Sequence, residues 1–175
     1  MRFTATELAG AWIIEPEPHK DSRGLFARTF CAREFREHGL LDTFVQCNTS
    51  WNSLTGTLRG LHYQLPPSSE VKLVRCTAGA LWDVVVDLRP DSPTYLQHVG
   101  VELTAKNRRA LYIPEMFAHG FQTLEDGTEV FYQMSDFYAA KSARGLRFDD
   151  PKLGIKWPLP VNSISDRDQN WTLLE

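Results

Sequence analysis

The sequence predicts an all-β protein, either a sandwich or a barrel of short strands with a few short peripheral helices. Short apolar runs recur along the chain, and Gly, Pro, Asn and Asp residues separate them at regular intervals. Residues 32–38 are the best helix candidate, and the segment covers only about two turns. The 175 residues contain no internal repeat, low-complexity tract or linker. We therefore expect a single domain over residues 1–175.

The N-terminal part is expected to form two strands and one helix, over residues 11–15, 25–30 and 32–38. Pro16 ends the first strand, and a turn at residues 21–24 leads into the second, which is rich in aromatic side chains. In the helix, Phe35 lies among charged residues and Gly39 follows as a C-terminal stop. The helix is short, so we expect it to lie at the periphery of the sheets.

Strands are expected to follow one another from residue 44 onward, over residues 44–51, 58–64, 71–77, 81–88, 99–103, 110–113, 117–124 and 129–138. The strand at 81–88 alternates between a face with Leu81, Asp83, Val85 and Asp87 and a face with Trp82, Val84, Val86 and Leu88. Because the second face is uniformly apolar, we expect it to pack against the opposite sheet. The Pro- and Trp-rich segment after residue 149 should wrap around the outside.

Composition argues against several classes of function. The formal net charge is -3 with both signs scattered and no basic arm, so nucleic-acid binding is not expected. The three cysteines have no metal-type spacing, which indicates reduced thiols in a cytoplasmic protein. The N-terminus lacks the apolar core of a signal peptide, and no apolar run reaches the roughly 20 residues needed to span a membrane.

The stretch from Gly56 to Gln64 carries the densest group of reactive side chains. Strict alternation along this strand places Leu58, Gly60, His62 and Gln64 on one face and Arg59, Leu61 and Tyr63 on the other. Gly60 would leave room beside His62, which makes this histidine a candidate acid or base. A core histidine that bonds a backbone carbonyl is an equally good interpretation of this stretch alone.

A metal site is one candidate for the chemistry. His62, Glu70 and His119 resemble the ligand set of the cupin jelly roll, a double-sheet β architecture. Metal cupins usually carry a His-x-His pair where this chain has His62-Tyr63-Gln64. Gln is a poor replacement for a nitrogen donor, so no bound metal is expected.

A metal-free site would use the same strand differently. His62 needs a carboxylate to fix its tautomer, and three are candidates: Asp83, Asp87 and Asp168. Lys72 and Arg59 could stabilise an oxyanion, and Tyr132 could supply a proton from the opposite side. The two cations could equally be solvated strand charges, and Tyr132 a core or edge aromatic.

The chain resembles the dTDP-4-dehydrorhamnose 3,5-epimerases, cupin-fold enzymes of deoxysugar biosynthesis. The shared motifs run in order over nearly the whole chain: Asp21–Phe26, Gln46–Ser50, Gly56–Gln64, Lys72–Arg75, Asp83–Leu88, Ser92-Pro93, Ile113-Pro114, Ala118–Phe121, Asp150-Pro151, Gly154-Ile155, Trp157-Pro158, Ser165 and Arg167-Asp168. The resemblance implies a cupin-type double-stranded β-helix (jelly roll), a sugar-nucleotide substrate, and no metal or organic cofactor. It also implies a homodimer whose subunits exchange N-terminal strands.

The same resemblance assigns roles to individual residues. His62 would be the base, Asp168 its orienting partner and Lys72 the group that stabilises the enolate oxygen. Tyr132 would return the proton on the opposite face of the sugar ring. Substrate contacts would come from Arg23, Arg28, Gln46, Asn48, Arg59, His119 and Arg167, with Arg23 supplied by the second subunit.

The implied activity is epimerisation at C3 and C5 of dTDP-4-dehydro-6-deoxy-D-glucose to dTDP-4-dehydro-L-rhamnose. Two positions depart from the family pattern, since Arg28 and Arg144 stand where family members often carry acidic residues. A C3-only or C5-only epimerase, or one that acts on another nucleotide, is therefore an alternative. A metal-dependent cupin dioxygenase and a non-catalytic sugar-nucleotide-binding cupin are more distant alternatives.

Overall fold

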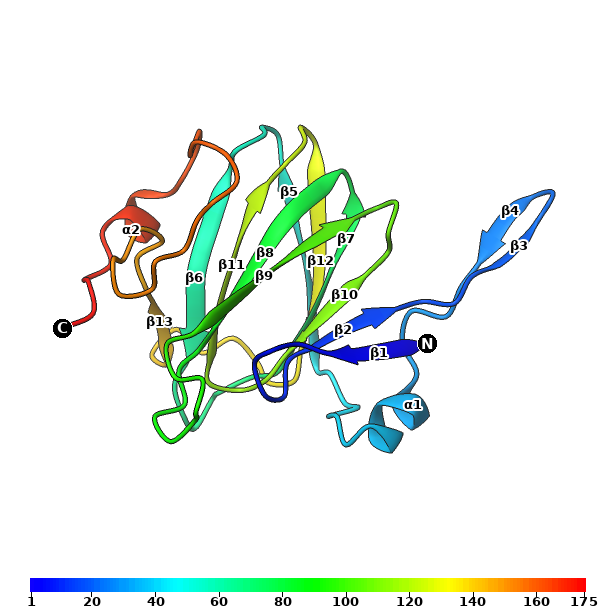
Figure 1. Ribbon diagram of the computed structural model, residues 1–175, viewed down its shortest axis with the longest axis horizontal. Coiled ribbons are helices and arrows are strands. Elements are labelled where there is room, and N and C mark those ends of the chain that lie inside the picture. The colour runs from blue at the N-terminus through cyan, green and yellow to red at the C-terminus, as the bar shows by residue number, and fades with distance from the viewer.

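The computed structural model describes residues 1–175 as two antiparallel sheets packed face to face, with a separate hairpin and two short helices (Figure 1). The six-stranded sheet has the spatial order β1 (Arg2–Ala5), β2 (Trp12–Glu15), β10 (Ala110–Ile113), β7 (Lys72–Ala78), β12 (Thr128–Met134), β5 (Gln46–Asn52). The five-stranded sheet has the order β13 (Ala143–Gly145), β6 (Leu58–Gln64), β11 (Phe117–Thr123), β8 (Ala80–Asp87), β9 (His98–Thr104). The expected all-β, cupin-type fold is confirmed.

A hairpin of two strands and two short helices lie outside the two sheets. Strands β3 (His19–Asp21) and β4 (Gly24–Phe26) form a hairpin that projects from the body of the molecule, as Figure 1 shows. Helix α1 (Ala32–Glu37) covers the outer face of the six-stranded sheet through the buried ring of Phe35, and α2 (Asp166–Gln169) lies near the C-terminus. Neither helix has the length and apolar character needed to cross a bilayer.

The main core fills the space between the two sheets. Val74, Leu111 and Val130 contribute from the six-stranded sheet, and Val85 and Phe121 from the five-stranded one. These side chains are almost completely buried, so their removal from water is the principal stabilisation of the sandwich.

The face of β8 that meets the opposite sheet is not the expected one. Leu81 and Val85 lie in the core between the sheets, on the same side as the fully buried Asp83. The uniformly apolar face, which includes Val84 and Val86, instead packs under the C-terminal segment with Leu146 and Leu153. The expectation was wrong because both faces of β8 are covered, so apolar alternation does not reveal which face meets the other sheet.

The alternation expected along β6 is also wrong, because the strand contains a bulge. His62 pairs with His119 of β11, whereas Arg59 pairs with Phe121, so β6 has one residue more than β11 between these pairs. Arg59 and His62 therefore share the inner face. A Cβ added at Gly60 would lie 2.6 Å from the Cα of Gly120, so this glycine permits close approach of two strands and does not create space beside His62.

Most strands lie within a few residues of the sequence expectations, and the helix expected at 32–38 is α1. The strand expected at 25–30 ends at Phe26, and the one expected at 129–138 ends at Met134. Three short strands and one helix were not expected: β1, β3, β13 and α2.

Candidate active site

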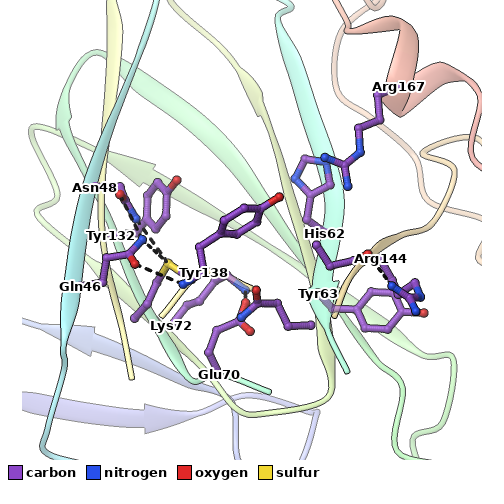
Figure 2. A pocket seen from close by; sticks show the side chains of 13 residues that line it. Gln46, Asn48, His62, Tyr63, Glu70, Lys72, Tyr132, Tyr138, Arg144 and Arg167 are labelled. Atoms are coloured by element: carbon purple, nitrogen blue, oxygen red, sulfur yellow. Dashed lines mark hydrogen bonds and ion pairs between the residues drawn. The ribbon is translucent and has the colours of Figure 1, made fainter. Parts of the chain in front are cut away.

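An open cleft lies between β6 of one sheet and β5, β7 and β12 of the other, toward the side of the sandwich where β13 and β5 are the edge strands. The cleft has two lobes with volumes of about 340 and 510 Å³, and His62, Tyr132 and Arg167 line both. Figure 2 shows His62 on one side of the first lobe and Tyr132 and Lys72 on the other. The cleft thus places groups from opposite sheets around one volume.

His62 forms a dyad with Asp168. The ring Nε2 lies 2.6 Å from Asp168 Oδ1, and the histidine is about half exposed to the cleft while the aspartate is buried. Of the three aspartates that the sequence offered as partners of His62, Asp83 lies near His119 and Asp87 bonds Arg89. Asp168 is therefore the partner of His62 in the structure.

Local structure holds Asp168 in place. Ser165 caps helix α2 by accepting a hydrogen bond from the Asp168 amide at 3.1 Å, and the Gly60 amide donates to Asp168 Oδ2 at 3.2 Å. Burial raises the pKa of this carboxyl, but the bonds from His62, Gly60 and Trp171 outweigh it and lower the pKa below the ordinary value. Asp168 is therefore an anion at neutral pH and can stabilise a protonated His62.

Two further groups with acid–base or electrostatic capacity face the cleft from the other sheet. Lys72 of β7 is buried and forms an ion pair with the buried Glu70. Burial raises the pKa of Tyr132 on β12, with the Arg59 charge opposing the shift, so the phenol keeps its proton at neutral pH. A cation and a proton donor therefore lie across the cleft from the histidine.

The structure brings four of the predicted substrate contacts to the same cleft: Gln46, Asn48, Arg59 and Arg167. Arg59 is oriented by a 2.7 Å hydrogen bond from its Nε to Asn52 Oδ1. Arg167 stacks over the Trp171 ring at 5.0 Å. Two guanidinium groups around one cleft suit an anionic ligand such as a diphosphate.

Three other predicted contacts lie outside the cleft of this chain. Arg23 is 88% exposed on the projecting hairpin, where it pairs with Asp21. Arg28 forms an exposed ion pair with Glu34. His119 is buried behind His62, with its Nε2 2.8 Å from Asp83 Oδ1, and burial raises the pKa of Asp83 against the opposing effect of His119.

Sequence reasoning assigned no substrate role to several residues that line the cleft: Ser50, Glu70, Tyr138 and Ala143. Arg144, whose position departs from the family pattern, also lines it. Ser50 follows Gln46 and Asn48 at intervals of two on β5, so strand alternation could have identified it. Tyr138 could not be found in this way. It lies in the loop after β12, whereas the sequence predicted that the strand continues to residue 138.

The alternative metal-ligand set does not converge. His62 pairs with Asp168, Glu70 with Lys72, and His119 lies near Asp83. No group of three or more His, Cys, Asp or Glu side chains is arranged to hold an ion. The donor arrangement thus does not fit the metal-cupin interpretation.

The chain is similar to known proteins over nearly its whole length. A family model described as dTDP-4-dehydrorhamnose 3,5-epimerase matches residues 5–175. The dTDP-4-dehydrorhamnose 3,5-epimerase of Methanothermobacter thermautotrophicus is 47% identical over 97% of this chain and 92% of its own length.

Two solved structures are informative neighbours. The Legionella pneumophila epimerase RmlC, in complex with dTDP-4-keto-L-rhamnose, has a TM-score of 0.92 and 40% identity over 98% of this chain and 92% of its own. ChmJ, a 3'-monoepimerase from Streptomyces bikiniensis in complex with dTDP-quinovose, has a TM-score of 0.88 and is 34% identical. The match covers 96% of this chain and 85% of the ChmJ chain.

Proposed function

The chain belongs to the dTDP-4-dehydrorhamnose 3,5-epimerase family, and on this premise we propose that it inverts C3 and C5 of dTDP-4-dehydro-6-deoxy-D-glucose to give dTDP-4-dehydro-L-rhamnose. The observation that carries the proposal is the His62–Asp168 dyad, which faces Tyr132 and Lys72 across the cleft. This arrangement offers a base on one side, a proton donor on the other, and a cation for the charge that develops between them.

The first half of each inversion is removal of a proton from a carbon next to the C4 ketone. His62 takes this proton, and the carbon–hydrogen electron pair becomes the double bond of an enolate. Asp168 stabilises the imidazolium that forms, while the Lys72 ammonium stabilises the negative oxygen. Both charges are thus balanced by groups that are already in place.

The second half is delivery of a proton to the opposite face. The Tyr132 phenol gives its proton to the planar carbon, the ketone re-forms, and the configuration is inverted. His62 then releases its extra proton to solvent, and Tyr132 takes one up. The same groups then act at the other carbon next to the ketone.

Nucleotide binding completes the proposed site. Arg59 and Arg167 bind the diphosphate, with Gln46 and Asn48 as neutral hydrogen-bonding groups in the same cleft. The reaction takes place in the cytoplasm, where the three unpaired cysteines would stay reduced.

A second subunit supplies Arg23 in this proposal. The hairpin that carries Arg23 projects from the molecule and exposes Phe26 to 75%, which leaves an apolar surface for a partner to cover. Co-expression of Arg23→Ala and His62→Ala chains tests this. If each cleft combines both subunits, mixed dimers hold one intact site and restore about one quarter of the wild-type rate; no restoration would contradict a shared site.

The nearest alternative is inversion at one carbon only, because the structural neighbour ChmJ is a 3'-monoepimerase. Incubation of the protein with the 4-keto sugar nucleotide in deuterated water separates the two. We expect NMR to show deuterium at both C3 and C5 and a product with the L-rhamnose configuration. Label at one carbon only supports the alternative. The same assay with UDP- and GDP-linked sugars tests the nucleotide.

A further inference from the structure

Glu70 has a carboxylate oxygen that the protein itself does not bind. The side chain is only 2% exposed, lines the first lobe of the cleft, and pairs through Oε1 with the ammonium of Lys72. Its second oxygen, Oε2, is buried and has no hydrogen-bond partner. A buried polar atom without a partner destabilises a protein, so a group is expected to bind there in the working enzyme.

Three other polar side chains that line the lobe already have hydrogen-bond partners within the protein. The Gln64 amide bonds three backbone groups in the loops at residues 68 and 137–139. Gln46 Oε1 accepts from the Tyr138 amide, and Asn48 contacts the sulfur of Met134. Figure 2 shows Glu70 beside Lys72 among the side chains that line the lobe. Glu70, by contrast, lines the same lobe and keeps a buried oxygen without a protein partner.

We propose that Glu70 is a positioning residue that holds the Lys72 ammonium through Oε1 and accepts a hydrogen bond from the substrate's C3 hydroxyl through Oε2. This proposal rests on the function proposed above, because it takes Lys72 to lie at the C4 oxygen. Glu70 acts on the reacting ketone through Lys72 and on the sugar through its hydroxyl.

The chemistry of the sugar selects the C3 hydroxyl. Two carbons are bonded to C4: C3 carries a hydroxyl, whereas C5 carries a methyl group and the ring oxygen. A carboxylate that shares the ammonium with the C4 oxygen lies next to C3 or C5, and only C3 offers it a proton donor. A charge-assisted hydrogen bond of this kind is about twice as strong as a neutral one, so Glu70 selects sugars that keep this hydroxyl.

Exchange kinetics with four variants test the role of Glu70. Glu70→Leu removes both acceptors, and the kcat for deuterium exchange should fall about 10- to 100-fold, less than the ~100- to 1000-fold expected for Lys72→Met. Glu70→Gln keeps an oxygen for Lys72 and should restore kcat to within about fivefold of wild type. Glu115→Gln is the matched control, because Glu115 contacts Ser69 of the same loop without lining the cleft.

The double variant separates positioning from a merely structural role. If Glu70 works through Lys72, Glu70→Leu should change kcat less than about threefold in a Lys72→Met background. Multiplicative losses, or a folded Glu70→Leu with wild-type kcat, would overturn the proposal. Thermal unfolding shows which variants are folded.

A substrate analogue without the C3 hydroxyl tests the second oxygen and does not depend on Glu70→Leu being folded. The wild type should prefer the hydroxylated sugar in kcat/KM for exchange at C5, and Glu70→Gln should reduce this preference about fivefold. An unchanged preference would overturn the hydroxyl contact. If the wild type shows no exchange on the natural substrate, the proposed function fails; if it does while the variants match it, only the role of Glu70 fails.

Discussion

Replacement of Asp168 by Asn removes one negative charge from the catalytic dyad with almost no change of shape. The Nε2–Oδ1 distance is 2.6 Å, and the Asn carbonyl can still accept the hydrogen bond from the Gly60 amide. The imidazolium that forms when His62 takes a proton would then lack its counter-charge. We therefore expect the variant to fold but to exchange substrate protons slowly.

The size of the effect follows from the geometry. Unit charges centred about 4 Å apart attract by about 4 kcal/mol at an effective dielectric constant of 20. Since the His62 side chain is 46% exposed, solvent screening reduces this to roughly 2–3 kcal/mol. That loss corresponds to a fall in kcat of about 30- to 150-fold.

Deuterium exchange at C3 and C5, followed by NMR, measures the rate, and thermal unfolding checks the fold. Asp166→Asn is the control, because Asp166 is an exposed acidic residue of the same helix α2, whereas the His62 ring bonds Asp168. A folded Asp168→Asn enzyme whose exchange rate stays within threefold of wild type would refute the role given to the dyad.

Three further predictions concern the donor, the fold and the thiols. Tyr132→Phe should reduce inversion, measured by NMR, more than deuterium exchange; equal loss of both would contradict a donor role. Burial raises the pKa of Asp87, but bonds from Arg89 and two hydroxyls outweigh it and hold this pKa well below its usual range. The ionised carboxylate therefore stabilises the fold at neutral pH, and this stabilisation is lost as the pH falls below about 4. Asp87→Asn should therefore lower the free energy of unfolding in urea by about 1–3 kcal/mol at pH 7 and by less at pH 3, and an equal loss at both would contradict the assignment. Burial raises the pKa of Cys76 to about 11, so mass spectrometry should find it unmodified by iodoacetamide at pH 8 unless urea is added.

The elements that sequence reasoning located are those whose pattern depends on local chemistry. The strand from Leu58 to Gln64 and the helix at Ala32–Glu37 follow from alternation, turn residues and a glycine stop. The faces of β6 and β8 did not follow. A bulge next to Gly60 and a C-terminal segment over Val84 and Val86 are tertiary features, and period-two alternation carries no signal for either.

The site shows the same limit. Single-sequence patterns identified His62 as a candidate and left its partner open among three aspartates, one of which, Asp168, lies 106 positions further along the chain. Only the fold brings helix α2 against β6, and only the fold shows that His119 lies behind His62 and outside the cleft. The family resemblance supplied the pairing that residue spacing could not.

The central claim is that one imidazole serves as the base at both carbons. Its most direct test is deuterium incorporation into dTDP-4-dehydro-6-deoxy-D-glucose by folded His62→Ala, measured separately at C3 and C5 by NMR. We predict that exchange is lost at both positions. Retention of wild-type exchange at either carbon would contradict the claim.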